Sequence, residues 1–527
     1  MPFAYWLADL LHYGQAGKAA LLGGLAVLAV SAWRESRPGS AGARGWRWEL
    51  AVAAPFLFIL AMEAFLRDHF GVGHDDTLVT EALFSTNSDE AAEFALANGR
   101  ALLKHAGLFA AALLTFGVML RLSNRYPGAP GATPGRSRSG LWPVWVFGGL
   151  FLLVHLNPTM RRADPFLYFP LRYAKWQHDL VLTRDLQQQL AQTQNDPGLA
   201  SVRYAGPDQR TVVFVLGESG TRLNWSLYGY PRPTTPRLQE VAHELLVFAD
   251  VITGYPGTNG SLKQIFSPAT IARPELWMTR PDILIVARRA GYKVFWLSNH
   301  STDRSGPVSI IASHADVTRL TNRGGSRSEG SHDEVLLPEL QRALDDPAPR
   351  KFIILHMLGQ HPAYQFRYPE PFARFGGAED AVSRALRADG RAFWAVMQRN
   401  EYDNAILYSD HVLRETLEMT RARGGAAAWL FAPDHGEDVA HYSNFVGHNS
   451  RVRAMYEVPM VFWASAAFGA APAGEAGLRA RPYQLDVLDH TLLGLLRIDG
   501  DFYDPASDIF SSTFRPAART MNGVPYP

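Results

Sequence analysis

The chain has 527 residues, of which 47% are hydrophobic and only 19% are charged, and its formal net charge is +1. A chain of this length divides into two or three domains, and its net charge gives no indication of nucleic acid as a partner. The absence of cysteine excludes disulfides, thiol catalysis and thiolate metal ligands. The low charged fraction is typical of chains that carry membrane segments.

Four apolar runs occupy the first third of the chain, and each is near the lower limit of about 20 residues for crossing a bilayer. The runs are Ala19–Trp33, Ala51–Leu66, His105–Leu120 and Leu141–Asn157. Basic residues at their ends can snorkel and so lengthen the effective span. We predict a helical transmembrane domain over residues 1–157 with four spans. Residues 3–12 form either a fifth, tilted span or a segment that lies in the interface.

The loops between the runs differ in charge. Arginines cluster in the first and third loops, at Arg34, Arg37, Arg44, Arg47, Arg121, Arg125, Arg136 and Arg138. The second loop is acidic. The positive-inside rule therefore predicts that the two arginine-rich loops are cytoplasmic, and that everything after the fourth span lies outside the cytoplasm. Buried core helices would have difficulty accommodating such clusters, so we disfavour that alternative.

Two ionisable residues, Glu63 and His105, lie within the predicted spans near their outer ends. Charged groups inside a membrane are often functional, but groups at the end of a span can also face interfacial water. We favour the second interpretation for both residues, and the first stays open.

Residues 158–205 form a transition between two kinds of sequence. Lys175–Gln194 has the pattern of an amphipathic, glutamine-rich helix. We expect this helix to lie along the membrane and to couple the domains on either side of it. The alternative is that this segment forms part of a groove for a lipid substrate.

From residue 211 onward, short apolar runs alternate with helical patterns. The first run, Thr211–Gly217, is continuously apolar, as expected for a strand buried on both faces. Further strands are predicted at Leu246–Val251, Tyr292–Leu297, Phe352–Leu355, Ala427–Phe431 and Met460–Trp463. Helices are predicted at 235–245, 260–266, 281–290, 401–421 and 484–495. This alternation predicts an α/β domain over residues 206–527, with a mostly parallel sheet sandwiched by helices.

Acidic residues and a histidine follow two of these strands. Glu218 follows the first strand, and Asp434 and His435 follow the strand at 427–431. In sheets of this kind, ligands bind outside the carboxyl ends of the strands. Carboxylate and imidazole groups suit zinc, so we predict that these three residues bind a divalent metal ion. The alternative is that each is an ordinary residue of a turn or strand end.

Thr258 lies in a glycine-rich turn just before a helix that is predicted to begin near Asn259. A helix N-terminus presents free N–H groups and the positive end of the helix dipole, which favour a phosphate and an alkoxide. We therefore consider Thr258 a candidate nucleophile, activated by coordination to the metal ion, and Ser261 a second candidate. The alternative is that Thr258 only caps the helix.

Other polar residues follow further strands. His361 and His448 are candidate metal ligands or general acids, and Asn299 is a candidate substrate contact. Each of the two histidines could instead be a surface loop residue. We assign no role to three histidines that are less well placed, namely His356, His411 and His441.

Several segments resemble, in the family's order, the bacterial membrane phosphoethanolamine transferases of the alkaline phosphatase/sulfatase superfamily. The similar segments are 85–94, Val213–Ser219, Leu227–Pro236, Phe366–Pro369, Tyr402–Tyr408 and Asp434–Glu437. Residues 227–236 read Leu-Tyr-Gly-Tyr-Pro-Arg-Pro-Thr-Thr-Pro, which looks like the most recognisable signature of that family. The resemblance covers nearly the whole chain.

The resemblance implies a zinc-dependent enzyme of the bacterial inner membrane with a periplasmic catalytic domain. Glu218, Thr258, Asp434 and His435 would bind one zinc ion. Thr258 would attack the phosphodiester of phosphatidylethanolamine, release diacylglycerol and become a phosphoethanolamine-threonine. An acceptor in the cell envelope, either lipopolysaccharide or a related glycan, would then take the group.

The resemblance also implies roles for three further residues. His361 and His448 would assist at a second metal ion or on the phosphoryl oxygens, and Asn299 would contact the phosphoethanolamine. We expect the protein to be a monomer.

The chain departs from the family's pattern near the nucleophile. Lys263-Gln264 stands where Pro-Cys is expected, and the turn at 257–260 reads Gly-Thr-Asn-Gly in place of a threonine-rich version. His300 stands where a small polar residue is expected, and there are four clear spans where five are usual. Rival interpretations are a phosphoglycerol transferase with the same kind of site and a non-catalytic envelope scaffold. A sulfatase is disfavoured, because no Cys/Ser-x-Pro-x-Arg run is present.

Overall fold

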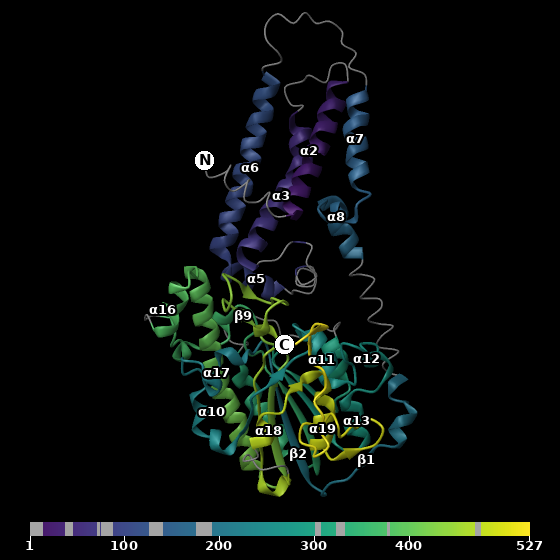
Figure 1. Cartoon of the computed structure of the whole chain (residues 1–527), viewed down its shortest axis with the longest axis vertical. Coiled ribbons are helices and arrows are strands. Elements are labelled where there is room, and N and C mark those ends of the chain that lie inside the picture. The colour runs from purple at the N-terminus through teal and green to yellow at the C-terminus, as the bar shows by residue number, and fades with distance from the viewer. Residues whose placement is uncertain are drawn as a thin grey trace, which may run out of the picture. The chain divides into compact units, whose positions relative to one another are not determined.

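The computed structural model describes residues 14–36, 46–70, 74, 79, 88–125, 141–174, 192–300, 307–322, 332–376, 380–469 and 476–526. The chain forms two compact units, Met1–Asp179 and Leu180–Pro527 (Figure 1), and each has its own hydrophobic core. The helix that we predicted at 175–194 falls almost wholly outside the described residues. The domain boundaries predicted from the sequence stay a prediction.

The first unit is helical. Its elements are α2 (Gly14–Glu35), α3 (Trp46–Phe70), α5 (Ser88–Ala97), α6 (Gly99–Arg125), α7 (Trp142–Val154) and α8 (Pro158–Arg162). Helix α3 packs against α2 and α6, and α2 also packs against α7. On α6 and α7, large apolar side chains point outward, with exposed fractions of 75% for Leu103, 71% for Leu114 and 75% for Trp145. An apolar outer surface of this extent indicates contact with lipid.

Three of the four predicted spans are helices long and apolar enough to cross a membrane: Ala16–Glu35, Trp46–His69 and Gly99–Leu122. The fourth, α7, is apolar but has only 13 residues. At a rise of 1.5 Å per residue such a helix is about 20 Å long, which is shorter than a hydrocarbon core of about 30 Å. The number of membrane crossings therefore stays a prediction.

Glu63 and His105 do not face interfacial water, so the interpretation that we favoured for them is wrong. Glu63 is fully buried, and its carboxylate accepts hydrogen bonds from Arg67 Nε at 2.7 Å and from the backbone N–H of His74 at 2.8 Å. His105 is also buried, with Nε2 3.2 Å from Asp68 Oδ2. These buried polar groups are compensated by partners within the helical unit, as burial requires.

The second unit contains a seven-stranded sheet in the order β3-β11-β8-β2-β7-β5-β6. Its strands are β2 (Arg210–Gly217), β3 (Leu246–Phe248), β5 (Lys293–Ser298), β6 (Val317–Leu320), β7 (Arg350–His356), β8 (Ala427–Pro433) and β11 (Met460–Ala464). All neighbouring pairs are parallel except the two that β11 makes, with β3 and β8. The mostly parallel sheet that the sequence predicted is therefore confirmed.

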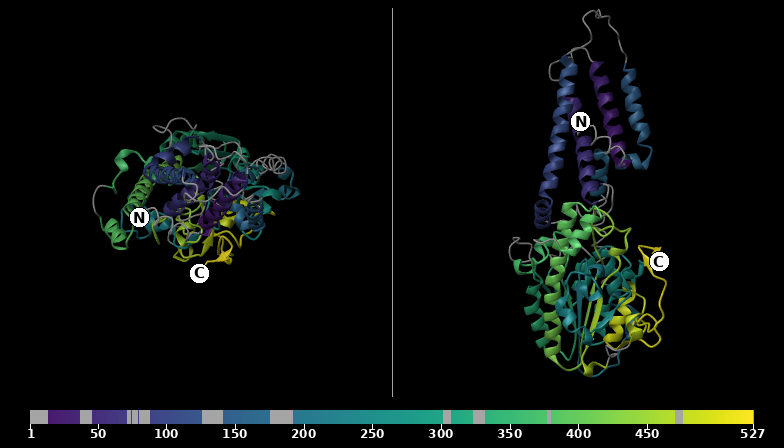
Figure 2. Two further views of the ribbon diagram at one scale, coloured as in Figure 1. Left: turned by 90° about the horizontal axis from the view of Figure 1, so that it is seen from above. Right: turned by 60° about the vertical axis from the view of Figure 1, so that its left-hand side comes forward.

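Helices cover both faces of this sheet. The helices of this unit are α10 (Pro236–Glu240), α11 (Thr258–Phe266), α12 (Leu276–Thr279), α13 (Ile283–Arg289), α14 (Pro307–Ser313), α15 (Leu337–Asp345), α16 (Ala381–Ala388), α17 (Phe393–Arg423), α18 (Ala476–Arg479) and α19 (Leu488–Leu495). Along β2, Val212, Phe214 and Leu216 pack with α11, α13 and α19, whereas Val213 and Val215 pack with α10, α15 and α17. Figure 2 shows the long α17 on one side of the sheet and the C-terminal elements on the other.

Short strands complete the unit outside the main sheet. They are β1 (Arg203–Tyr204), β4 (Val251–Ile252), β9 (Asp438–Val439), β10 (Val446–Gly447), β12 (Tyr483–Gln484), β13 (Ile498–Asp499), β14 (Thr520–Met521) and β15 (Val524–Pro525). The strand predicted at 246–251 is split between β3 and β4, which belong to different sheets. Strand β6 was not predicted, because at this edge of the sheet its residues are half-buried or exposed and form no apolar run.

The register aligns the carboxyl ends of four neighbouring strands. His356 of β7 pairs with Leu216 of β2 on one side and with Ser298 of β5 on the other. Gly217 of β2 pairs with Pro433 at the end of β8. The residues that follow these four strands therefore meet at one edge of the sheet, where ligands bind in folds of this kind.

Candidate active site

Residues from three elements converge at this edge of the sheet. Glu218 follows β2, Asp434 and His435 follow β8, and Thr258 is the first residue of α11. Thr258 Oγ1 lies 3.3 and 3.2 Å from the two carboxylate oxygens of Glu218 and 3.4 Å from Nε2 of His435. Nε2 of His435 is 3.3 Å from Glu218 Oε1 and 3.4 Å from Asp434 Oδ2. Glu218, Asp434 and His435 are buried.

Four spacings, Thr258–Glu218, Thr258–His435, Glu218–His435 and Asp434–His435, match those between neighbouring ligands of a tetrahedral zinc ion. Zinc bonds of about 2.0–2.1 Å place neighbouring ligand atoms about 3.3–3.4 Å apart, and the observed distances are 3.2–3.4 Å. Asp434 Oδ2 is buried and has no hydrogen-bond partner among the described residues. A buried carboxylate oxygen is costly unless a cation or a donor compensates it. The residues present therefore fit a divalent cation with oxygen and nitrogen ligands.

Hydrogen bonds hold these side chains in place. Asp434 Oδ1 accepts from the backbone N–H groups of Ser219 at 3.1 Å and His435 at 2.8 Å, and the Ser219 hydroxyl donates to Glu218 Oε1 at 2.8 Å. Nδ1 of His435 lies 2.7 Å from the Gly436 carbonyl oxygen, so it carries the proton and leaves the Nε2 lone pair for the site. Ser219 has a φ of 55°, a strained conformation for a residue with a side chain.

Burial and the charges of their neighbours shift the pKa values of Glu218, Asp434 and His435. Burial raises the pKa of Asp434 to about 8, and the negative charge of Glu218 adds to this shift. Burial acts against the charged form of His435, but Asp434 and Glu218 raise its pKa to about 10. Burial also acts against the charge of Glu218, yet His435 holds the pKa of Glu218 well below its usual value. From the protein groups alone, Asp434 and His435 each hold a proton at neutral pH, which a bound cation would replace.

Thr258 is not the cap of α11. Gly257 occupies the cap position with extended backbone, and the Thr258 hydroxyl points to the carboxylate of Glu218. The interpretation that Thr258 only caps the helix is therefore wrong. The second candidate, Ser261, is fully buried and donates its hydroxyl to the Tyr255 carbonyl oxygen at 2.9 Å. Of the two hydroxyls, only that of Thr258 contacts the acidic residues.

His361 and His448 lie on either side of this cluster. The His361 ring packs 6.2 Å from the His300 ring, and burial lowers the pKa of His361 to about 3. The His448 ring packs 4.7 Å from the His435 ring, and Glu218, His435 and His448 lie close enough to share an ion. Partial burial and the neighbouring His435 lower the pKa of His448. Both rings are neutral at pH 7, so each offers one N–H donor and one lone pair.

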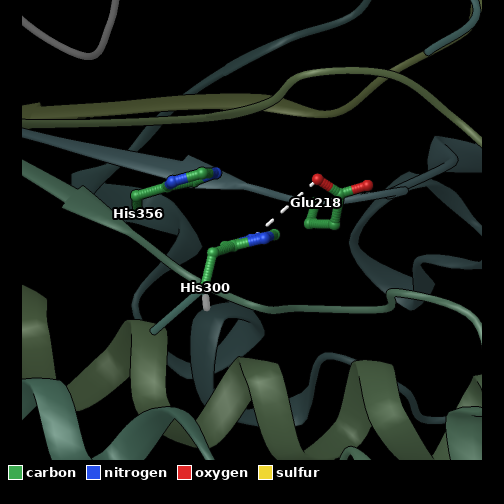
Figure 3. Close-up of side chains that lie close together, drawn as sticks. All are labelled: Glu218, His300 and His356. Atoms are coloured by element: carbon green, nitrogen blue, oxygen red, sulfur yellow. Dashed lines mark ion pairs between the residues drawn. The ribbon is translucent and has the colours of Figure 1, made fainter. Parts of the chain in front are cut away.

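A second pair of histidines, His300 and His356, lies near Glu218 (Figure 3). His300 Nε2 is 4.0 Å from Glu218 Oε2, and the two rings are stacked with centroids 4.0 Å apart and planes within 10°. The distances would allow an ion between these three residues. However, the lone pair of an imidazole lies in the ring plane, so two stacked rings cannot both direct one at the same ion. His300 Nε2 also donates to the Met357 carbonyl oxygen at 2.8 Å.

The side chain of Asn299 makes contacts away from the acidic cluster. It is fully buried, its Nδ2 donates to Asp333 Oδ1 at 3.0 Å, and its Oδ1 accepts from the Thr321 hydroxyl at 3.1 Å. The neighbouring residue, His300, is the one whose ring approaches Glu218. Successive residues at a strand end point to opposite sides, so the sequence alone could not decide between them.

Three residues at the site were given no role from the sequence: His300, His356 and Glu437. Glu437 is fully buried two residues beyond His435, which is unusual for a carboxylate in a loop. The sequence signal for it was its place in Asp-His-Gly-Glu, after a strand end. His356 gave a weaker signal, because it forms the last residue of β7 and so reads as part of an apolar strand.

Comparison with known proteins shows which family the chain belongs to. A profile of the family described as Sulfatase matches residues 210–498, more than half of the chain, and the chain belongs to this family. Within it, the chain is similar to bacterial phosphoethanolamine transferases, which confirms the relation predicted from the motifs. Phosphoethanolamine transferase EptC of Escherichia coli (strain K12) is 33% identical over 386 residues, which are 71% of this chain and 65% of that protein. The alignment thus spans just under two thirds of this relative.

Solved structures agree with this assignment. The C-terminal periplasmic domain of EcEptC from Escherichia coli, in complex with Zn, is 32% identical with a TM-score of 0.57, over 60% of this chain and 91% of that one. The integral membrane protein lipooligosaccharide phosphoethanolamine transferase A (EptA) from Neisseria meningitidis is 20% identical with a TM-score of 0.62, over 94% of this chain and 99% of that one. The second match shows the fold alone, and it confirms a helical membrane part followed by an α/β domain.

Proposed function

We propose that this chain transfers phosphoethanolamine from phosphatidylethanolamine to a cell-envelope acceptor, either lipopolysaccharide, at lipid A or a core sugar, or a related glycan. The observation that carries the proposal is the Thr258 hydroxyl, which lies within 3.4 Å of Glu218 and His435 at the start of a helix. Free N–H groups at this position suit a phosphate. The relation to phosphoethanolamine transferases supports the choice of transferred group.

Glu218, Thr258, Asp434 and His435 would hold a zinc ion in this protein. The spacing of their ligand atoms and the unpartnered Oδ2 of Asp434 support this set, and a related domain was solved with zinc. When bound, zinc lowers the pKa of a hydroxyl that it contacts and stabilises charge on phosphoryl oxygens. The absence of cysteine is consistent with a site made only of oxygen and nitrogen ligands.

In the first half of the reaction, Thr258 Oγ1 attacks the phosphorus of the lipid headgroup. The bond between Oγ1 and phosphorus forms while the bond from phosphorus to the glycerol oxygen breaks, so diacylglycerol leaves. The hydroxyl proton of Thr258, which is directed at Glu218, is lost, and the departing oxygen gains one proton. The product on the protein is a phosphoethanolamine-threonine.

In the second half, a hydroxyl of the acceptor attacks the same phosphorus. The new bond from oxygen to phosphorus forms, the bond to Thr258 breaks, and Thr258 regains a proton. His361 and His448 are neutral, so either ring can accept a hydrogen bond from the acceptor hydroxyl or donate an N–H to a phosphoryl oxygen. Contact between Asn299 and the phosphoethanolamine stays part of the proposal, and it requires the amide to exchange its bonds to Asp333 and Thr321.

We further propose that the protein is a monomer that crosses the bacterial inner membrane several times, with its catalytic unit in the periplasm. Three long apolar helices support the membrane anchor. The arginine-rich loops support the orientation through the positive-inside rule. This arrangement gives the catalytic unit access to phosphatidylethanolamine in the membrane that anchors it.

Intact-protein mass spectrometry tests the proposal. After incubation of the full chain with phosphatidylethanolamine vesicles, we expect one phosphoethanolamine adduct, which Thr258→Ala abolishes and Ser261→Ala retains. An adduct that persists in Thr258→Ala, or that maps to Ser261, would contradict the assignment of the nucleophile.

The same measurement separates the rival functions. An adduct of glycerol phosphate, formed from phosphatidylglycerol vesicles, would indicate a phosphoglycerol transferase. No adduct from either lipid with zinc bound would favour a non-catalytic scaffold. Mass spectrometry of envelope glycolipids and glycans from cells with and without the protein then identifies the acceptor by its added phosphoethanolamine.

A further inference from the structure

Glu437 is a buried acidic residue that is neither one of the proposed zinc ligands nor given a role in the proposed reaction of Thr258. It is fully buried, whereas glutamate in a loop is normally exposed. Its Oε1 accepts a hydrogen bond from the Tyr364 hydroxyl at 2.5 Å. Its Oε2 is buried and has no hydrogen-bond partner among the described residues. The hydrogen bond from Tyr364 therefore fixes Oε1, whereas Oε2 has no donor among the described residues.

The group that faces the second oxygen is a histidine. His448 Nε2 lies 3.8 Å from Glu437 Oε2, slightly beyond hydrogen-bond distance. The His448 side chain is 28% exposed, and its ring packs 4.7 Å from the ring of His435. His448 thus lies between the proposed metal ligand His435 and the buried carboxyl group of Glu437.

Tyr364 holds the carboxylate in its orientation. It is buried, and its ring packs edge-on against Tyr402 with centroids 5.2 Å apart. The Tyr402 hydroxyl donates to the Ser219 carbonyl oxygen at 2.6 Å and accepts from the Thr221 N–H at 3.0 Å. Tyr364, which holds Glu437, therefore packs against Tyr402, and Tyr402 is hydrogen-bonded to the turn that follows Glu218.

We propose that Glu437 is a positioning residue for His448: its Oε2 accepts the Nε2 proton of His448 and thereby fixes which ring nitrogen presents its lone pair to the reacting groups. This inference rests on the proposed function for its effect on the reaction, but not for the contact itself. A neutral imidazole carries its proton on one nitrogen only, and an acceptor oxygen at Nε2 holds the proton there. Nδ1 then has the lone pair, which suits it to accept a hydrogen bond from an acceptor hydroxyl.

A double-mutant cycle tests the effect on the reaction. The readout is the single-turnover rate at which preformed phosphoethanolamine-protein passes its group to an added acceptor. Glu437→Gln keeps the shape of the side chain and the acceptor for Tyr364, but its amide can no longer accept from His448. We expect a loss of about 10–100-fold, as for other residues that orient a functional histidine. In a His448→Gln background, the same change should cost nothing further. Equal losses in both backgrounds would overturn the proposal.

The tautomer of His448 provides a second measurement, because it would not change if Glu437 only stabilised the fold. In protein labelled with ¹⁵N at histidine, His448→Gln identifies the His448 signals by their loss. We expect wild-type protein to show the proton on Nε2, and Glu437→Gln to show a mixture of both tautomers. An unchanged tautomer in Glu437→Gln would overturn the proposal even if the chain transferred a different group, so this result is distinct from failure of the proposed function.

A second variant covers the case in which Glu437→Gln does not fold. Tyr364→Phe keeps the carboxylate but removes the hydroxyl that directs it, so we expect the same tautomer mixture with a smaller loss of rate. Zinc content and the thermal unfolding midpoint of each variant serve as controls. If Glu437→Gln does not fold, a tautomer that stays on Nε2 in Tyr364→Phe, together with a wild-type rate, would overturn the proposal.

Discussion

Asp434 and His435 hold protons that a metal ion must displace. Burial and the charge of Glu218 raise the pKa of Asp434, and the charges of Asp434 and Glu218 raise the pKa of His435, so protons compete with an ion for both residues. We expect zinc binding near pH 7 to release about two protons, and zinc affinity to fall as the pH is lowered. Calorimetric titration in buffers of different ionisation enthalpy measures this proton release.

Asp434→Asn gives the matched test. The amide keeps the shape of the side chain but carries no charge, so we expect zinc affinity to fall by more than about 100-fold, since even residues that only orient a ligand are worth about 10–100-fold. Proton release should also fall by about one proton per ion. Zinc binding that is unchanged in Asp434→Asn would remove Asp434 from the ligand set, and binding that is independent of the buffer in wild type would contradict the predicted proton release.

Ser219 joins the two acidic ligands at the cost of backbone strain. Its N–H donates to Asp434, its hydroxyl donates to Glu218, and its φ is 55°. We expect Ser219→Ala and Ser219→Gly to lower zinc affinity equally, by about 10-fold, because both remove the hydroxyl. Since glycine adopts positive φ freely, Ser219→Gly should unfold at a higher temperature than Ser219→Ala. A lower midpoint for the glycine variant would contradict the role of strain.

At the scale of elements, the Tyr-Gly-Tyr-Pro-Arg signature binds helices together and does not line the metal site. Arg232 is buried, and its guanidinium donates to Asp380, Asp403, Asn400 and Ser383 of the α16 and α17 region at 2.6–3.0 Å. A fork of donors with this geometry cannot be reproduced by lysine. A family signature can thus reflect packing, while the reacting residues lie elsewhere.

Removing this buried charge should therefore destabilise the catalytic unit. We expect Arg232→Gln to lower the free energy of unfolding by about 3–5 kcal/mol, because buried Asp403 would lose one of its two cationic neighbours, Arg232, and keep only Arg399. Chemical denaturation measures the loss. Arg342→Gln is the control, since the exposed pair of Arg342 with Glu339 should contribute little to stability. Similar losses in both variants would contradict this account.

The sequence predicted the central elements because their signals are local. Continuous apolar runs identify β2, β7 and β8, and the polar residues that follow them identify Glu218, Asp434 and His435. Side-chain direction at the strand ends was not predictable, because it depends on neighbours distant in the sequence. Asn299 bonds to Asp333, 34 positions away, while His300 takes the place beside Glu218. The burial of Glu437 beneath Tyr364 is likewise a product of tertiary packing.

At the scale of the whole molecule, the proposed metal ligands and the long apolar helices belong to different units. The proposed ligands and both hydrophobic clusters around the sheet lie within Leu180–Pro527, which is a compact unit with its own core. The membrane unit contributes the apolar helices that hold the chain at the bilayer. Separation of the two should therefore leave zinc binding intact and impair only the reaction with lipid.

Residues 192–527 expressed alone provide the test. We expect this fragment to bind zinc with the affinity of the full chain and to form the Thr258 adduct from a short-chain, water-soluble phosphatidylethanolamine at a similar rate. With donor lipid in vesicles, adduct formation should fall by about 10²–10⁴-fold, because the tether no longer supplies a high effective concentration of lipid. Intact-mass kinetics on both donors measure the ratio. If the fragment were equally slow with the soluble donor, the membrane unit would contribute to the chemistry itself and not only to access.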